Sequence, residues 1–579
     1  MKMKAFITVA IIFTIAVSLR SVRIHPDKNI ELTDFIPDTS LLYFEQRNGS
    51  NALAQSAASR SDNNLESIDY VGVAQEVGLQ DDSIAVMKKY LDFYKTATED
   101  PQFDAIFGKR LSFAVMQPVD AFAGTDIMEF LRGHVVAVVE PEYPLEWLEI
   151  AEKHYDKQTT ELILQSLQYG NHLIKRVILK DELFFLVAID RFFVISQNEK
   201  QLHLCIDTFD GKQPSLSNDR DFQEINKNIA DPDRLVYVPM KTAREFFSSL
   251  FEAHSFPNKD VLLKDLQSTI GFTGFGYGAW RKHSQIEEKV LIHFEKSEIN
   301  AFAKRYVETP QVESSMLSLV TDDPMIFYWS NTLNFKHFLM YIEDGARQDP
   351  RLAEFLTRLE AVTGKDAAET FALFGEEVSL IIEPAPADDL FPFPLGAFFI
   401  KVEKVDELKD TMEKLLQRYN LPMKKGEYGP AMYSYWSLSP QDGLLPLYGF
   451  WNNLFFFGNS SNLLHKVIDT KLSEYSLADI EEVQKIDPGL NRKGNSITYM
   501  NNIHLITMIK NFLEVLGTFV AIEDREIALK AGVLLKKIVN PLLDRAMMYN
   551  ASVSRSHFTP DMLVIDSITD ISGNTRSKE

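Results

Sequence analysis

The chain has 579 residues, and its 60 Lys and Arg against 82 Asp and Glu leave a formal net charge of −22. An apolar share of 45% with 25% charged residues is typical of a folded chain. This composition excludes wholesale disorder, a collagen-like repeat and a bundle of membrane spans. The acidic balance would repel phosphate backbones, so we expect no nucleic-acid partner.

The chain begins with an apolar run, Ala5–Leu19, that follows Lys2 and Lys4 and precedes two arginines. A charged start with a short apolar stretch is typical of a secretory signal, and about 20 residues are needed to span a membrane. We therefore interpret residues 1–20 as a signal peptide or, if uncleaved, a membrane anchor. Either alternative exports the body of the protein to the periplasm or cell envelope. We find no second long apolar segment, so membrane contact is expected only through residues 5–19, and only if they are uncleaved.

The most informative pattern is an internal repeat. A polar tract at 48–82 interrupts the first copy and is expected to be an insertion loop. Because the second copy lacks this tract, the number of residues that separates matching segments is larger before the tract than after it. The repeat predicts two homologous domains, at 33–308 and 318–571, with a junction at Thr309–Ser318. The recurring segments are Pro37–Phe44 with Thr321–Tyr328 at an offset of 284, Phe107–Ser112 with Phe374–Ser379 at 267, and Phe193–Thr208 with Phe455–Thr470 at 262, an offset that Leu235–Tyr237 and Ile497–Tyr499 share.

Strand and helix patterns interleave within each copy without the regular alternation of a parallel sheet. Short turns between apolar strands predict antiparallel neighbours, so the fold class is α+β, a largely antiparallel sheet with packed helices in each of two tandem domains. The predicted elements of the first copy are strand Val135–Val139, a helical stripe at Leu145, Leu148, Ala151 and Tyr155, hairpin Leu183–Ile189 with Phe192–Ser196, and hairpin Thr269–Trp280 with Glu287–Phe294. Those of the second are strand Ala397–Val402, a stripe at Val405, Leu408, Met412 and Leu415, hairpin Leu447–Trp451 with Leu454–Gly458, and Asn550–Ser556 with Met562–Ile568.

Glycines in this chain predict packing rather than phosphate binding. Gly274, Gly276 and Gly278 share one face of a strand, and their spacing matches no nucleotide-binding loop, so we expect another element to approach them closely. Phe107-Gly108 and Phe374-Gly375 are interpreted as helix ends with Gly at the C′ position.

Cysteine and histidine give no metal or cofactor signal. Cys205 is the only cysteine, so no intramolecular disulfide or thiolate cluster can form, and we interpret it as a small core residue. The histidines lack the spacing of a zinc site. We therefore expect no metal and no cofactor.

The sharpest catalytic candidate is His203 with Asp207, repeated as His465 with Asp469. A spacing of four places each pair on one face of a helix, where a carboxylate could orient an imidazole for acid–base work. The alternative is an inherited helix-end hydrogen bond. Because no nucleophile or metal pattern lies beside either pair in the sequence, we favour the alternative and assign no catalytic residue.

The opening strand Pro37-Asp38-Thr39-Ser40-Leu41-Leu42-Tyr43 and the pair Phe107-Gly108 that enters a strand resemble a family of uncharacterised bacterial exported proteins, a domain of unknown function. The resemblance lies mainly in the N-terminal third of the chain. It implies an envelope location and no established activity, and no functional residue can be transferred from it.

Two function classes remain open. The sequence favours a non-catalytic envelope protein that binds a partner protein, a lipid or a glycan, or acts as a scaffold. The alternative is an envelope hydrolase whose site is assembled from distant residues, with His203 or His465 as the base. Because both copies carry the His-Asp pair without a nucleophile pattern, the first class is preferred and an enzyme is disfavoured.

Overall fold

A computed structural model describes most of the chain. Several sequence predictions lie outside the described residues: the segment 1–20, most of the tract at 48–82, the pair Phe107-Gly108 and the helical stripe from Leu145 to Tyr155. The described ranges are 30–47, most of 68–91, 109–118, 127–141, 162–179, 182–253, 258–333, 335–347, 349–386, 393–419, 423–437 and 443–572.

The chain forms two compact units, Met1–Trp280 with Lys289–Glu298, and Arg281–Glu288 with Ile299–Glu579. The main division thus lies between Glu298 and Ile299, N-terminal to the junction predicted at Thr309–Ser318.

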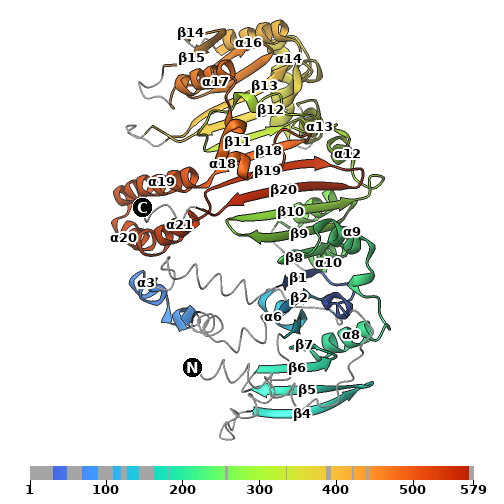
Figure 1. Ribbon diagram of the computed structural model, residues 1–579. Helices are drawn as coiled ribbons and strands as arrows, with labels where there is room; N and C mark the ends of the chain where they lie inside the picture. The colour runs from blue at the N-terminus through green and yellow to red at the C-terminus, as the bar shows by residue number, and fades with distance from the viewer. Residues whose placement is uncertain are drawn as a thin grey trace. The chain divides into compact units, whose positions relative to one another are not determined.

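The first unit contains, in chain order, η1 (Leu32–Phe35), β1 (Leu42–Arg47), α3 (Tyr70–Glu76), β2 (Arg110–Val115), α6 (Ile127–His134), β3 (Val135–Glu140), β4 (Leu162–Tyr169), β5 (His172–Leu179), β6 (Glu182–Ile189), β7 (Phe192–Ser196), α8 (Glu199–Phe209), η2 (Leu216–Asn218), α9 (Arg220–Ile229), β8 (Arg234–Pro239), α10 (Met240–Ala253), α11 (Lys259–Ser268), β9 (Phe272–Lys282) and β10 (Gln285–Phe294), the last two joined by a tip assigned to the second unit. Figure 1 shows these elements in blue to green.

The second unit contains α12 (Ala301–Glu308), η3 (Leu317–Leu319), β11 (Ile326–Ser330), α13 (Phe335–Ala346), α14 (Pro350–Thr363), α15 (Ala367–Phe371), β12 (Phe374–Glu383), β13 (Leu395–Val402), α16 (Val405–Tyr419), β14 (Lys424–Tyr428), β15 (Ala431–Tyr435), β16 (Leu447–Trp451), β17 (Leu454–Gly458), α17 (Ser461–Ser473), η4 (Leu477–Asp479), α18 (Glu481–Lys485), β18 (Ser496–Asn501), α19 (Asn502–Glu523), α20 (Arg525–Leu534), the π-helical turn η5 (Leu535–Val539), α21 (Asn540–Ala546), β19 (Ala551–Phe558) and β20 (Met562–Asp570).

Each unit has an antiparallel sheet, and the order of strands is the same in both. In the first unit the order is β4-β5-β6-β7-β3-β2-β1-β8-β9-β10. In the second it is β14-β15-β16-β17-β13-β12-β11-β18-β19-β20. Helices and antiparallel sheets together confirm the α+β prediction.

The ladders of the two units also keep the same register. Matching positions of β1 and β11 are 284 residues apart. Matching positions of β7 and β17 are 262 residues apart, as are those of β8 and β18. These are the offsets found in the sequence. The matched pairs are Tyr43–Tyr237 with Phe327–Tyr499, and Val139–Phe193 with Ile400–Phe455.

Short turns close the predicted hairpins as expected. Asp190 between β6 and β7 has a φ of 55°, and Asn452 between β16 and β17 has a φ of 54°. Asp and Asn adopt this left-handed conformation more readily than most residues, so the sequence itself favours the two-residue turn.

The sheet of the second unit carries a core on each face. One core gathers Trp329, Phe399, Phe456 and residues of α17. The other contains Leu408 of α16 with Ile400 and Phe455. Alternating side chains of one strand thus pack into two different cores, because successive residues point to opposite faces of a sheet.

The glycine stripe on β9 is confirmed as a packing surface. Ile225 and Ile229 of α9 are almost fully buried, and a Cβ on Gly276 or Gly278 would overlap with their side chains, while one on Gly274 would lie 2.9 Å from Ile225 Cδ1. The missing side chains therefore let α9 approach the strand.

Two local predictions are wrong. Gly375 does not end a helix. It is the second residue of β12, which begins at Phe374, and its φ is not positive. Within the tract predicted as a loop, Tyr70–Glu76 forms α3, since Asp69 caps the helix by accepting a hydrogen bond from Gly72 N at 2.8 Å.

Candidate functional site

The predicted His203–Asp207 pair lies on α8, where Asn198 caps the helix by accepting a hydrogen bond from Lys200 N. Its side chains are joined through a third residue, Tyr169, at the end of β4. The Tyr169 ring stacks on the His203 ring with centroids 3.7 Å apart, and the Tyr169 hydroxyl donates to Asp207 Oδ2 at 2.8 Å. The carboxylate is thus engaged by tyrosine instead of orienting the imidazole.

The second unit repeats this arrangement on α17. The Tyr428 ring stacks on His465 with centroids 3.8 Å apart, and the Tyr428 hydroxyl donates to Asp469 Oδ2 at 2.9 Å. Tyr433 of β15 adds a contact of 3.2 Å between its hydroxyl and His465 Nε2. We call these two sets, Tyr169–His203–Asp207 and Tyr428–His465–Asp469, the Tyr–His–Asp clusters.

Sequence reasoning missed the tyrosines of these clusters because they lie far from the helices in the chain. A local signal does exist, since each tyrosine is followed by a glycine at a turn. Gly170 has a φ of 55° and Gly429 a φ of 53°, a conformation that glycine adopts without strain. The repeated Tyr-Gly step at the end of β4 and β14 could have indicated the pairing.

The protonation properties of the clusters favour packing over catalysis. The hydrogen bond to Asp207 raises the pKa of the Tyr169 hydroxyl, and the hydrogen bond to Asp469 does the same for Tyr428. Burial lowers the pKa of His203, outweighing the opposite effect of Glu199 and Asp207. A neutral imidazole on a tyrosine ring holds the hairpin end against the helix.

Replacing His203 with phenylalanine is expected to reduce the acid sensitivity of the first unit. Because the folded-state pKa of His203 lies below its usual value, the unfolded chain binds the proton more readily, and wild-type stability falls as the pH drops below about 6.5. Phenylalanine preserves a stacked ring on Tyr169 but cannot be protonated. Calorimetric melting at about pH 7 and about pH 5 checks this difference. Equal losses in both proteins would contradict it.

A buried charged cluster occupies β1 and β2 of the first unit. The Glu45 side chain is only 2% exposed. Its carboxylate accepts hydrogen bonds from Tyr43 Oη at 2.8 Å, Arg47 Nε at 2.7 Å and Arg110 Nη2 at 2.9 Å. Burial raises the pKa of Glu45, but the contacts with Arg47, Arg110 and Tyr43 lower it by more than burial raises it. The pKa of Glu45 therefore lies below its usual value.

The second unit carries a neighbouring ion pair on β12 and β13 with the positions of the positive and the negative residue exchanged. By ladder position, Arg110 and Glu140 of the first unit match Glu377 and Lys401 of the second. Arg110 Nη1 lies 3.7 Å from Glu140 Oε2, and Lys401 Nζ lies 2.8 Å from Glu377 Oε1. Trp329 Nε1 also donates to Glu377, at 3.0 Å. An ion pair is present at this position in both units although each partner has changed sign.

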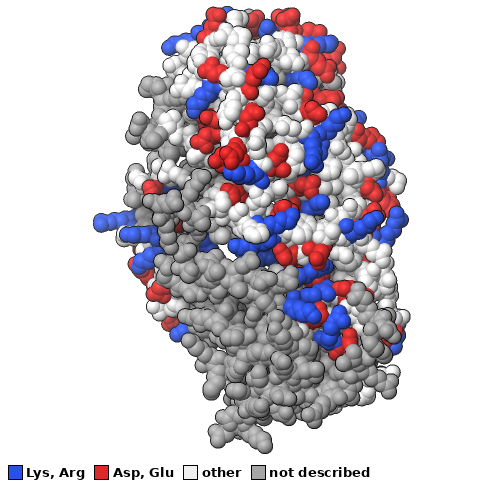
Figure 2. Space-filling view, in the orientation of Figure 1, with Lys and Arg blue, Asp and Glu red and all other residues white. Residues whose placement is uncertain are grey.

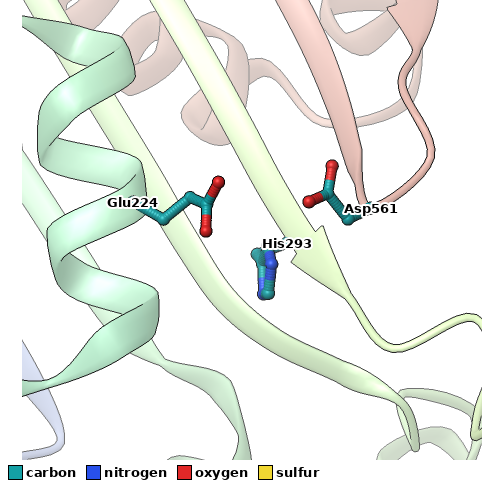
Figure 3. A group of neighbouring side chains, drawn as sticks. All are labelled: Glu224, His293 and Asp561. Carbon is teal, nitrogen blue, oxygen red and sulfur yellow. The ribbon is translucent and has the colours of Figure 1, made fainter.

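Figure 3 shows Glu224 on α9, His293 on β10 and Asp561, residue types that bind metals. Glu224 and His293 belong to the first unit and Asp561 to the second, so these three side chains do not define a site within either unit. Inside the first unit, buried His293 Nδ1 lies 2.7 Å from Thr273 Oγ1 and 3.0 Å from Asp221 Oδ1. The expectation of no metal remains a prediction.

An exposed apolar surface lies on α19, α20, η5 and α21, which together we call the helical lobe. Figure 1 draws its helices next to one another in red. Lys510 Nζ on α19 pairs with Asp544 Oδ1 on α21 at 2.6 Å, which ties the two helices together. Exposed apolar side chains of the lobe are Ile503, Phe512, Leu516, Phe519, Ile527, Leu529, Leu534 and Leu542.

The lobe corrects the statement that no second long apolar segment exists. Asn502–Val520 is long and apolar enough to cross a membrane, and only 6% of the stretch is buried. Lys510 and Glu514 interrupt the run, so the sequence contains no uninterrupted apolar stretch of that length at this place. An average over a window of helical length would have found it.

Charge elsewhere is mixed. On the face that Figure 2 shows, acidic and basic side chains are interspersed rather than gathered into a field of one sign. Among the described residues of that face, such a surface gives no extended basic track for a polyanion.

These features define an α+β protein with two sheet-containing units, internally bonded polar clusters and an exposed apolar lobe. Residues 108–521 match the family model described as "Protein of unknown function (DUF3352)", and the chain belongs to this family. The match confirms the resemblance to a domain of unknown function, but it begins at residue 108 and so does not include the opening strand at Pro37–Tyr43.

No curated protein matches the chain. Solved structures of TP0453 are similar over part of it. Crystal form IV has 9% identity and covers 46% of this chain and 81% of that one, and crystal form I has 11% identity and covers 50% and 90%. Both have a TM-score of 0.23, so neither carries an argument about this protein.

Proposed function

We propose that this chain is an exported, non-catalytic binding protein of the cell envelope, built from two homologous domains, whose binding surface is the helical lobe. The lysine-flanked run Ala5–Leu19 supports export. The shared strand order and the matching ladder register support a duplication, because unrelated domains would not keep both order and register.

The observation that carries the binding function is the contrast between the polar clusters and the lobe. Asp207 and Asp469 each accept a hydrogen bond from a tyrosine of their own unit. These contacts support an inherited structural role for both Tyr–His–Asp clusters. Phe512, Leu516 and Phe519, in contrast, are 41–55% exposed. Contiguous exposed apolar side chains of this kind usually mark an interaction site.

Three of the exposed apolar residues of α19 also lie on one helical stripe. Phe512, Leu516 and Phe519 are spaced by four and three residues, so their side chains project from the same side of the helix. A face of this kind binds a partner through its apolar surface and needs no bound cofactor or nucleophile.

Complementation of a strain that lacks the gene tests this function. A variant with Phe512→Ser, Leu516→Ser and Phe519→Ser is expected to fold normally, as judged by circular dichroism, but not to restore the envelope defect of the deletion, measured by detergent sensitivity and dye entry. The paired variant His203→Ala with His465→Ala is expected to restore it. Full complementation by the lobe variant, or loss of complementation in a well-folded histidine variant, would overturn the proposal and favour a hydrolase.

A further inference from the structure

We infer that the helical lobe docks onto the surface of a lipid bilayer that contains anionic headgroups, lying in the interface rather than crossing it. This inference deepens the proposed function and rests on it, since it names the partner of the same surface. The lobe is formed by side chains of the second unit alone.

The first argument concerns the two arms of the lobe, which are α19 and the returning stretch formed by α20, η5 and α21. α19 is 22 residues long, about 33 Å at 1.5 Å per residue, which is enough to reach across the hydrocarbon core. The returning arm, Arg525–Ala546, has the same length but carries seven charged residues: Arg525, Glu526, Lys530, Lys536, Lys537, Asp544 and Arg545. An arm of that composition cannot cross hydrocarbon, so the pair cannot insert as a transmembrane hairpin. An in-plane position avoids this cost because charged side chains stay in the headgroup layer.

The second argument concerns charge. The lobe, Asn502–Ala546, holds six Lys or Arg and five Asp or Glu, a net charge of +1, whereas the whole chain carries −22. The most acidic part of the protein is therefore elsewhere. An anionic bilayer would repel most of this chain but not its lobe, and this difference would orient the protein with the lobe toward the membrane.

The third argument concerns where the lysines lie. Lys536 and Lys537 are exposed and follow Leu534, which is itself 37% exposed. Lysine next to exposed leucine is typical of interfacial helices, because the long side chain reaches the headgroups while the apolar neighbour enters the acyl boundary. A protein partner would more often present a concave apolar pocket for these side chains and would not require the adjacent basic residues.

The predicted N-terminal segment fits the same location. An uncleaved Ala5–Leu19 would hold the chain at a bilayer and raise the effective concentration of the lobe at the lipid surface. A cleaved segment would leave the lobe as the membrane-binding element.

The test uses the full chain and vesicles of phosphatidylglycerol mixed equally with phosphatidylcholine, compared with phosphatidylcholine alone. A Phe519→Trp variant reports burial of the lobe itself through the difference between its fluorescence and that of the wild type, which carries the five native tryptophans of the chain. We expect its emission to shift to the blue on anionic vesicles and to move little on neutral ones. Emission that stays unchanged on anionic vesicles would overturn the inference.

Two sets of variants, measured by co-sedimentation, separate the apolar and the charged contributions. Phe512→Ser, Leu516→Ser and Phe519→Ser together should weaken binding to anionic vesicles at least tenfold. A matched control replaces exposed apolar residues of the same unit outside the lobe, Phe355→Ser with Leu472→Ser and Tyr475→Ser, and should bind as wild type does. Lys536→Ser with Lys537→Ser should lower the preference for anionic vesicles by about fivefold per lysine. Equal loss in the lobe and control variants would contradict the inference.

Failure of the lipid inference and failure of the proposed function give different results. If the wild type ignores vesicles but forms a concentration-dependent dimer that the lobe variant does not form, the occupant is a second copy, and the lipid inference falls while the binding function stands. If the lobe variant loses vesicle binding yet restores the deletion strain fully, lipid docking stands and the proposed function falls.

Discussion

Replacing Glu45 with alanine is expected to lower the free energy of unfolding of the first unit by about 3 kcal/mol, because it removes a buried carboxylate that two mostly buried guanidinium groups share. The Arg47 and Arg110 side chains are only 19% and 18% exposed, and both lie within 2.9 Å of the Glu45 carboxylate. Among the described residues, Arg47 then keeps only Asp231, and Arg110 keeps Glu31 and Glu140. The two positive charges still face each other across the β1–β2 ladder without the carboxylate between them. Chemical denaturation followed by fluorescence measures the loss.

The pH dependence gives this prediction a second readout. The pKa of Glu45 lies below its usual value in the folded chain, so the carboxylate contributes stability above its unfolded pKa and loses it as the pH falls through the folded value. The difference between wild type and Glu45→Ala should therefore shrink on acidification below about pH 4.5. Glu252→Ala, at an exposed position of α10, is the matched control, expected to change stability by less than about 0.5 kcal/mol. A similar small loss at Glu45 would contradict the buried ion-pair argument.

Replacing Gly276 with valine is expected to destabilise the first unit by about 2–3 kcal/mol through overpacking. A Cβ at this position would overlap with Ile225 of α9, whose side chain is fully buried. Either α9 must move away from β9 or the strand must bend, and both lose packing against the sheet. Thermal melting and hydrogen exchange of α9 amides measure the effect.

A double variant shows whether the clash with Ile225 is the cause. Ile225→Ala combined with Gly276→Val should cost less than the sum of the two single changes, because the second change fills the space that the first one leaves. Gly133→Ala on α6, where an added Cβ meets nothing within 4 Å, should leave stability unchanged or raise it slightly. Strict additivity of the first pair would refute the close-packing explanation.

The Tyr–His–Asp clusters and the helical lobe are the two candidate functional features of this chain. From the sequence, a repeated histidine with a carboxylate four residues later was the best chemical candidate. In the structure that carboxylate accepts a hydrogen bond from a tyrosine of a distant strand, and we therefore propose the exposed apolar surface of the lobe, which carries no chemical motif, as the functional feature.

The sequence by itself determined those features that depend on neighbours in the chain. Strand alternation and turn residues predicted the hairpins β6–β7 and β16–β17. A two-residue turn at Asp190 or Asn452 brings the two flanking strands next to each other, so each is the nearest pairing partner of the other. The parity of the glycines on β9 predicted a close approach, because alternate residues always share a face. The burial of Cys205 followed from its place on an apolar helix face, and that burial raises the pKa of its thiol to about 12.

Only the tertiary structure decided which distant groups meet and which apolar residues remain exposed. Tyr169 reaches Asp207 across 38 residues, and no local pattern specifies a contact at that separation. Likewise, Phe512 and Phe519 have the composition of core residues in the sequence, and hydrophobicity alone cannot distinguish a buried side chain from an exposed one. Exposure depends on whether another element covers the helix, and that is fixed by the packing of the whole unit.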